Sequence, residues 1–211
     1  MKIAIIGSGN MGSALARRAA AAGHEVTMAA KNEADTKKIA QDIGSGVRAS
    51  PLAGLAEKAD LIIAATPYEQ QATAIKNAGT VSGKIVVDIS NPVKQDYSGL
   101  LVGHSTSAAE EIAKALPGAK VVKAFNTVFA QVLTEGPDFG ETRRAAVFYA
   151  GDDESAKQTV RTLIETMGFE PIDAGPLPNA RYLEPIGMLN IWFGYMAKQG
   201  TGIAPTWLRR G

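Results

Sequence analysis

Short apolar runs alternate with longer mixed segments along most of this 211-residue chain. The apolar runs predict strands at residues 2–6, 25–29, 47–50, 60–66, 84–90, 120–125, 143–150 and 169–173. The segments between them predict helices over residues 13–22, 31–42, 51–58, 68–77, 108–116 and 153–167. Runs such as 60–66 are almost continuously apolar, as in strands that are covered on both faces. This alternation predicts an α/β protein with a doubly wound, mostly parallel sheet.

The last apolar run and the tail after it depart from this rhythm. Pro171 lies inside the run 169–173, which places that strand at an edge of the sheet. Residues 179–198 predict a long helix that is kinked or restarted at Pro185. We therefore expect a C-terminal helical extension, residues 175–211, packed on the sheet.

The helix predicted at 179–198 is apolar on two sides. One set of residues at helical spacing is expected to cover the sheet, and it comprises Tyr182, Ile186, Leu189, Phe193 and Met196. Met188, Trp192 and Tyr195 form a second apolar face. A helix that is apolar on two sides normally has a second partner. The second face therefore predicts a homodimer contact or a wall of the substrate pocket, with plain core as the alternative.

The first apolar run leads without a spacer into a glycine-rich turn. The turn consists of Gly7, Ser8, Gly9, Asn10, Met11 and Gly12, which spell G-x-G-x-x-G before an alanine-rich helix. In a Rossmann-type βαβ unit the first glycine permits a tight turn, the second lets a pyrophosphate approach, and the third lets the helix pack closely. Free N–H groups at the helix start face the phosphates. Residues 1–174 are therefore expected to form a dinucleotide-binding domain.

The end of the second predicted strand indicates which dinucleotide is bound. NAD sites carry a carboxylate there for the ribose 2′-OH, whereas a 2′-phosphate requires cations. Here the strand ends at Ala30, Lys31 and Asn32, and the first carboxylate, Glu33, comes later in the loop. Lys31 is able to pair with a 2′-phosphate, and Asn32 and Ser8 are able to donate hydrogen bonds to it. We therefore expect NADP(H) as the cofactor in preference to NAD.

Three more strand ends carry residues suited to a planar ligand. They are Thr66-Pro67, Ser90-Asn91-Pro92 and Phe125-Asn126-Thr127. In a doubly wound sheet the ligand lies outside the carboxyl ends of the strands, so these residues are expected near the glycine-rich turn. Neutral amides are able to orient a nicotinamide carboxamide. The alternative for Asn91-Pro92 and for Asn126 is an ordinary turn.

Composition excludes several other kinds of function. The net charge is +1, so no broad attraction to nucleic acid or to an anionic membrane is expected. The chain has no cysteine and two histidines, which excludes disulfides and makes a zinc site improbable. No segment has the ~20 apolar residues of a membrane span, and the run 2–6 is too short for a signal peptide. We expect a cytoplasmic protein whose partner is a small-molecule redox acceptor.

Five stretches of the chain together resemble one enzyme family. They are GSGNMG (7–12), AATP (64–67), DISNP (88–92), SAAEEIAKALPGAKVVKAFNTV (107–128) and ARYLEPIGML (180–189). They are similar to the NADPH-dependent coenzyme F-420 (deazaflavin) reductases, relatives of the cytoplasmic domain of the Steap metalloreductases.

This resemblance implies an activity and a set of site residues. It implies that hydride passes directly between the nicotinamide and a stacked deazaflavin, coenzyme F-420, or a flavin. It places Ser8 and Lys31-Asn32 at the 2′-phosphate, and Asn91, Pro92 and Asn126 beside the nicotinamide. It also favours a homodimer.

Direct transfer between two rings needs no acid or base from the protein. The sequence agrees, because it shows no obvious catalytic His, Cys or Lys-Asp constellation, and no catalytic side chain is expected. A β-hydroxyacid or pyrroline-carboxylate dehydrogenase shares the glycine motif but adds a helical domain of ~100 or more residues, for which 175–211 is too short. The alternatives that remain are a non-catalytic NADP-binding redox sensor and a ferric or flavin reductase.

Overall fold

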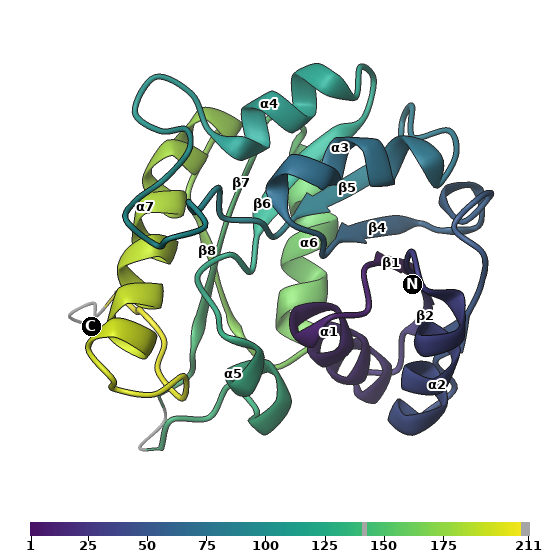
Figure 1. The fold of residues 1–211 in the computed structure, drawn as a ribbon, viewed down its shortest axis with the longest axis horizontal. Coiled ribbons are helices and arrows are strands. Elements are labelled where there is room, and N and C mark those ends of the chain that lie inside the picture. The colour runs from purple at the N-terminus through teal and green to yellow at the C-terminus, as the bar shows by residue number, and fades with distance from the viewer. Residues whose placement is uncertain (141–142, 208–211) are drawn as a thin grey trace.

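The computed structural model describes residues 1–140 and 143–207, and within these residues eight strands form a single sheet. The strands are β1 (Lys2–Ile6), β2 (Glu25–Ala29), β3 (Arg48–Ala49), β4 (Leu61–Ala64), β5 (Ile85–Asp88), β6 (Lys120–Ala124), β7 (Ala146–Gly151) and β8 (Glu170–Asp173). Their order in the sheet is β3-β2-β1-β4-β5-β6-β7-β8 (Figure 1). Neighbours run parallel except β6 and β7, which are antiparallel. The strand that contains Pro171 is an edge strand, as predicted.

Helices cover both faces of this sheet. One face carries α1 (Asn10–Ala21), α2 (Glu33–Ile43), α5 (Ala130–Glu135) and α6 (Glu154–Thr166). The other carries α3 (Tyr68–Asn77), α4 (Ala108–Ala115) and α7 (Ala180–Ile191). Strand β1 shows why the sequence folds this way, since Ile3 and Ile5 face the first layer while Ala4 and Ile6 face the second. The predicted Rossmann-type, doubly wound, mostly parallel sheet with a C-terminal helical extension is confirmed.

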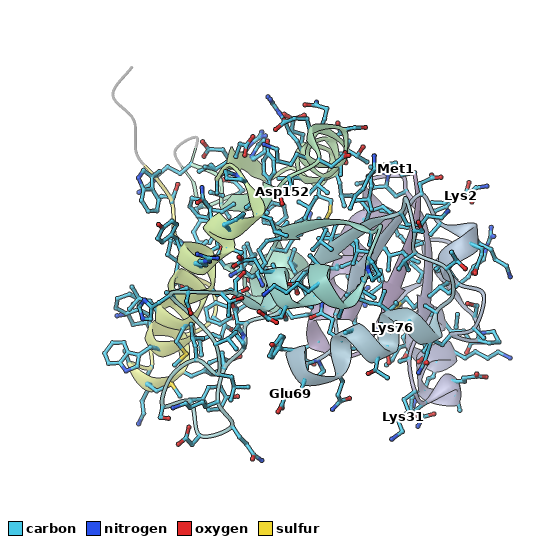
Figure 2. The ribbon with its side chains drawn as sticks, turned by 90° about the horizontal axis from the view of Figure 1, so that it is seen from above. Met1, Lys2, Lys31, Glu69, Lys76 and Asp152 are labelled. Carbon is cyan, nitrogen blue, oxygen red and sulfur yellow. The ribbon has the colours of Figure 1, made fainter. Side chains whose placement is uncertain are left out.

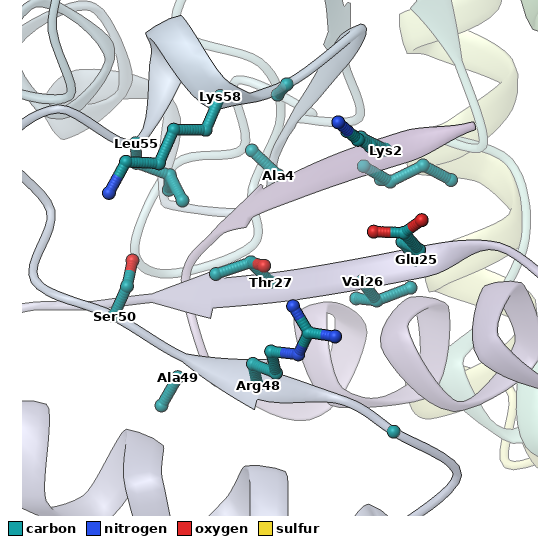
Figure 3. Close-up of a pocket in the computed structure, with 13 residues that line it drawn as sticks. Lys2, Ala4, Glu25, Val26, Thr27, Arg48, Ala49, Ser50, Leu55 and Lys58 are labelled. Carbon is teal, nitrogen blue, oxygen red and sulfur yellow. The ribbon is translucent and has the colours of Figure 1, made fainter.

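The connection from β3 to β4 is not the helix that the sequence predicts for 51–58. Gly54 has φ +76°, which is outside the helical region, and only the short 3₁₀ turn η1 (Ala56–Lys58) follows it. With no full helix above it, this part of the sheet has a hollow of about 420 Å³. Figure 3 shows the hollow, with Lys2, Thr27, Arg48 and Lys58 among its lining residues.

Helix α5 is an element that the hydrophobic pattern does not predict. It has six residues, too few for a 3.6-residue periodicity to emerge. Its Val132 and Leu133 are buried, and the Arg18 guanidinium donates to the Leu133 carbonyl at 2.8 Å. Helix α5 therefore packs next to α1 on the same face of the sheet.

The tail is helical, but its inward face is not the predicted one. The chain continues from η2 (Leu177–Asn179) through α7 without a break at Pro185, and then forms the π-helical turn η3 (Trp192–Met196). The buried residues of α7 are Ala180, Leu183, Glu184, Gly187 and Asn190. The expectation that Tyr182, Leu189 and Met196 cover the sheet is wrong, because they are 69%, 51% and 42% exposed.

The physical reason is that α7 lies close to the sheet and to polar strand ends. Small residues and residues that make hydrogen bonds therefore face inward, and large apolar ones face outward. Trp192 and Tyr195 of the predicted second face are exposed, while Met188 is half-buried. In Figure 1, α7 runs alongside β7 and β8 at one end of the molecule. Residues 208–211 of the predicted extension lie outside the described residues.

No helix in the part of the chain that the structure describes is long and apolar enough to cross a membrane.

Candidate functional site

A cleft of about 630 Å³ lies at the carboxyl ends of β1, β4, β5 and β6. Of the predicted site residues, those that line it are Gly9, Asn10, Met11, Thr66, Pro67, Asn91 and Asn126. Ser90 and Thr127, at the same predicted strand ends, line it too. Pro92 is buried next to Asn91 and is not part of the lining. Sequence reasoning did not name Tyr68, Phe129, Gly187 and Asn190 as site residues, although it allowed the helix at 179–198 as a wall of the pocket.

The glycines of the turn between β1 and α1 have different surroundings. Gly7 has φ +115°, and a Cβ there would overlap the carbonyl oxygen of Ala65. A Cβ on Gly12 would overlap the carbonyl oxygen of Gly7. Gly9 has φ −71°, and a Cβ there would meet nothing within 4 Å. The turn therefore packs closely at Gly7 and Gly12 and leaves open space beside Gly9, where a ligand is able to approach the backbone.

Helix α1 also begins without a side-chain cap. The helices α2, α4 and α6 are capped by Asn32, Ser107 and Asp153, whose side chains each accept a backbone N–H from the first turn. At α1 the N-cap residue is Gly9, which has no side chain to accept one. The first N–H groups of α1 therefore have no side-chain acceptor, and they lie with the positive end of the helix dipole beside the cleft that Gly9, Asn10 and Met11 line, which suits a pyrophosphate.

Ser8 and the start of α2 lie next to each other. Thr36 Oγ1 donates to the Asn32 carbonyl at 2.7 Å and lies 3.3 Å from Ser8 Oγ. The Asn32 side chain accepts the N–H of Asp35 at 3.2 Å. Lys31 is exposed, and its side chain lies on the outer surface in Figure 2. The structure thus brings Ser8 and Asn32 together, with Lys31 adjacent in the chain, and leaves all three outside the cleft lining.

Two amides form a pair at the carboxyl ends of β5 and β6. Asn91 Nδ2 donates to the Asn126 carbonyl at 2.7 Å, and Asn126 Nδ2 donates to Asn91 Oδ1 at 2.9 Å. Asn126 Nδ2 also donates to the Leu183 carbonyl of α7 at 2.9 Å. On the same helix, a Cβ added at Gly187 would lie 2.5 Å from Asn91 Oδ1. The pair is therefore held by contacts from the sheet and from α7.

Several buried polar atoms at this cleft have no hydrogen-bond partner in the part of the chain that is described. They are Thr66 Oγ1, Ser90 Oγ, Asn126 Oδ1 and Thr127 Oγ1, and all four residues line the cleft. An unsatisfied buried polar group costs about 1–3 kcal/mol, which a ligand is able to relieve. A nicotinamide carboxamide and a ribose carry donors and acceptors of the required kind. The residues present therefore fit the nicotinamide half of NADP(H).

Tyr68 borders the same cleft from the start of α3. Burial raises the pKa of its phenol above the ordinary value of 10.0, and the negative charges of Glu111, Glu184 and Asp88 raise it further. The phenol is consequently protonated at neutral pH, so Tyr68 is able to donate a hydrogen bond to a ligand.

A buried ion cluster lies next to this cleft, where the sequence showed no obvious Lys-Asp constellation. Lys123 Nζ is 2.8 Å from both Asp88 Oδ2 and Glu184 Oε1, and all three side chains are at most 1% exposed. None of the three lines the cleft. One signal in the sequence could have found it, namely a lysine inside the apolar run 120–125.

Comparison with known proteins gives one match to a family model. Residues 2–92, which hold the glycine-rich turn and end at Pro92, match the model described as "NADP oxidoreductase coenzyme F-420-dependent".

Among curated proteins, the chain is 31% identical over 207 residues to the F-420-dependent NADP reductase of Methanothermobacter marburgensis, covering 90% of this chain and 91% of that protein. It is 33% identical over 193 residues to rat metalloreductase STEAP3. That match covers 90% of this chain and only 38% of the metalloreductase.

Among solved structures, a protein from Arthrobacter sp. FB24, provisionally assigned as an F-420-dependent NADP reductase, is 30% identical with a TM-score of 0.87. The match covers 99% of this chain and all of the other. The likeness therefore includes the C-terminal extension as well as the rest of the sheet.

Proposed function

Because this chain belongs to the family of F-420-dependent NADP reductases, we propose that it transfers a hydride between NADPH and a deazaflavin, coenzyme F-420, or a flavin-like acceptor. It is an NADP-dependent oxidoreductase, and the proposal concerns the acceptor and the chemistry. We expect the reaction to take place in the cytoplasm.

The observation that carries this proposal is a single cleft bordered by two kinds of residue. Gly9 and the uncapped start of α1 border it from the β1 end, and both suit a pyrophosphate. The amide pair of Asn91 and Asn126 borders it from the β5 and β6 ends, with unpartnered buried polar atoms nearby. Because β1, β4, β5 and β6 are successive in the sheet, one extended dinucleotide is able to reach both regions.

The protein's own contribution to such a reaction is binding and orientation. NADPH supplies the hydride, whose bond to the nicotinamide breaks as a bond to the acceptor ring forms, and a solvent proton balances the reaction. The N–H groups of α1 hold the pyrophosphate, and Asn91 and Asn126 orient the nicotinamide. Ile89, Phe125 and Ile191, which also line the cleft, exclude water from the two rings. No side chain is required to give or take a proton.

Turnover with different acceptors tests the proposal. NADPH oxidation would be followed with coenzyme F-420, with flavin mononucleotide and with a ferric chelate in parallel. Oxidation with F-420 or the flavin supports the proposal. Oxidation with the ferric chelate alone would favour a ferric reductase, a possibility suggested by the likeness to STEAP3. No oxidation with any acceptor, despite NADPH binding, would favour a redox sensor.

We expect NADPH to bind at least about tenfold tighter than NADH. A 2′-phosphate paired with Lys31 gains about 1–2 kcal/mol from a charge-assisted contact, and Ser8 and Asn32 lie together beside it. Titration of both cofactors measures the ratio. Lys31→Ala should reduce it toward one, whereas Lys38→Ala, on the solvated side of α2, should leave it unchanged. Equal affinities for the wild-type protein would contradict the expectation.

We also propose a homodimer formed through the outer face of α7 and η3. Five large apolar residues on this face are exposed: Tyr182, Leu189, Trp192, Tyr195 and Met196. Fully burying one such side chain is worth about 1.5–3 kcal/mol, so a second copy gains much by covering them together. Tyr195 also lines the cleft, which links this surface to the site.

Trp192→Glu places a charge in the proposed contact, and sedimentation should then show a monomer. We expect lower acceptor turnover and unchanged NADPH binding in this variant. Gln199→Glu adds the same charge at an exposed position nearby and should remain dimeric. A wild-type protein that is monomeric at micromolar concentration would rule the dimer out.

A further inference from the structure

The Lys123 ammonium is the centre of a buried hydrogen-bond network at the carboxyl ends of β5 and β6. Its Nζ donates to Asp88 Oδ2 at 2.8 Å, to the Ser90 carbonyl at 2.5 Å, and lies 2.8 Å from Glu184 Oε1. An ammonium has three N–H groups, and each has an acceptor here. The network therefore fixes the end of β6 to the chain just after β5 and to α7.

The network holds two carboxylates and one ammonium, and backbone and amide donors balance the surplus negative charge. Glu184 accepts the N–H groups of Ala108 and Ala109 at 2.9 and 3.2 Å, at the positive end of α4. Asp88 Oδ1 accepts Gln71 Nε2 at 2.9 Å. Every carboxylate in the network is thus hydrogen-bonded, which gives the network one defined geometry.

This network fixes the backbone of Ser90, the residue that precedes Asn91 in the chain. Ser90 has both backbone groups held, its N–H by Asp88 Oδ1 at 2.8 Å and its carbonyl by Lys123. Its Oγ, by contrast, has no partner and its residue lines the cleft. The next residue in the chain is Asn91, whose side chain pairs with Asn126. The network therefore sets where Ser90 and Asn91 present their side chains.

The same network fixes the other support of the amide pair, which is α7. Glu184 belongs to the network, and its neighbour Leu183 offers the carbonyl that accepts Asn126 Nδ2. Gly187, one turn further along, packs against the Asn91 side chain. The two supports of the amide pair, the backbone at Ser90 and helix α7, are consequently joined through Lys123.

We infer that Asp88, Lys123 and Glu184 are positioning residues for hydride transfer, acting through Ser90 and the Asn91–Asn126 pair. The inference rests on the proposed function, because it assumes that a nicotinamide occupies this part of the cleft. Hydride transfer needs reacting atoms about 3–3.5 Å apart, and a misplacement of ~1 Å can cost about 10²-fold in rate. A network that controls the amide pair therefore controls rate more than cofactor affinity, which depends chiefly on the glycine-rich turn and α1.

The test uses the isosteric variants Glu184→Gln and Asp88→Asn, each of which removes one charge from the network and retains its volume. We expect NADPH affinity to stay within about threefold, kcat for F-420 reduction to fall at least about tenfold, and KM to change little. The emission of protein-bound NADPH should shift as well, because it reports the surroundings of the nicotinamide. Two variants are included because one of them alone could fail to fold.

Glu110→Gln is the matched control. Glu110 pairs with Arg181 at 2.6 and 2.8 Å across the same junction of α4 and α7, but neither residue belongs to the network. The Glu110→Gln variant should have lower thermal stability than the wild type, with unchanged kcat and unchanged NADPH emission. If Glu184→Gln and Asp88→Asn behave like this control, the network is structural only and the inference is overturned.

The emission measurement separates this inference from the proposed function. If wild-type protein binds NADPH but reduces neither F-420 nor the flavin, the proposed function fails, while a shifted emission in the network variants still supports the inference. Unchanged emission in both variants overturns it whatever the acceptor. A wild-type protein that does not bind NADPH overturns both.

Discussion

Replacing Gly9 with valine is expected to lower NADPH affinity at least about 100-fold while the protein keeps its fold. Gly9 has φ −71° and ψ −172°, an extended conformation that valine adopts without strain. A Cβ at this position meets no protein atom within 4 Å, so the new side chain enters the open space beside the α1 N-terminus. In a Rossmann-type turn that space belongs to the pyrophosphate.

Two other glycine variants make this experiment specific. Gly103→Val also adds a side chain where a Cβ meets nothing within 4 Å, but away from the turn, and should bind NADPH normally. Gly12→Ala should instead destabilise the fold, because its Cβ would overlap the Gly7 carbonyl. Cofactor titration and thermal unfolding would be measured for all three. Normal NADPH binding by Gly9→Val would show that the phosphates lie elsewhere.

Lys123→Met is expected to lower the free energy of unfolding by about 3–5 kcal/mol. The substitution keeps an unbranched side chain of similar length but leaves the buried carboxylates of Asp88 and Glu184 without their counter-ion. Removing one partner of a buried ion pair costs this much because the remaining charge stays desolvated. Such a loss is a large share of the 5–15 kcal/mol that stabilises a typical domain.

Urea unfolding at neutral pH measures this effect. Lys114→Met serves as the control, because Lys114 pairs with Glu111 in solvent with 69% of its side chain exposed, and its unfolding midpoint should stay at the wild-type value. Equal midpoints for Lys123→Met and wild type would mean that the network contributes little to stability.

The sheet and the glycine-rich turn could be predicted because their physical signals are local. A strand covered on both faces must be apolar at nearly every position, as in β4, and such a run is visible without knowing its neighbours. The turn needs glycine at Gly7 and Gly12, where a Cβ would overlap a carbonyl oxygen. Pro171 likewise indicated an edge strand because it cannot donate to a ladder.

The inward face of α7 could not be predicted from periodicity. That method assumes that the large apolar residues of a helix face the core. In α7 the positions that meet the sheet and the cleft are Glu184, Gly187 and Asn190, whose burial depends on partners far away in the sequence. Asn190, for example, donates to the Thr127 carbonyl at 3.1 Å. The helix was therefore predicted with the wrong side toward the sheet.

The ion-pair partners of Lys123 could not be predicted from the sequence either. Its contacts are Asp88 and Glu184, which are 35 and 61 residues away, and no spacing rule relates them. Asp88 alone could be expected to be a hydrogen-bonded structural carboxylate, because it lies inside the predicted strand 84–90. Only the three-dimensional arrangement shows that one lysine serves both carboxylates and the Ser90 carbonyl.

The antiparallel step from β6 to β7 has a consequence for how the molecule could be re-engineered. Strands β7 and β8 run antiparallel to β6, so β8 ends beside the amino ends of the other strands, opposite the cleft. Helix α7 must therefore run back along the sheet to reach the cleft. The wall that α7 and η3 give to the cleft is thus one contiguous piece of chain, separate from the glycine-rich turn at residues 7–12. Chimeras that exchange residues 175–207 between relatives would therefore replace this wall as one piece, together with its contacts to Asn91, Lys123 and Asn126, while leaving the glycine-rich turn in place.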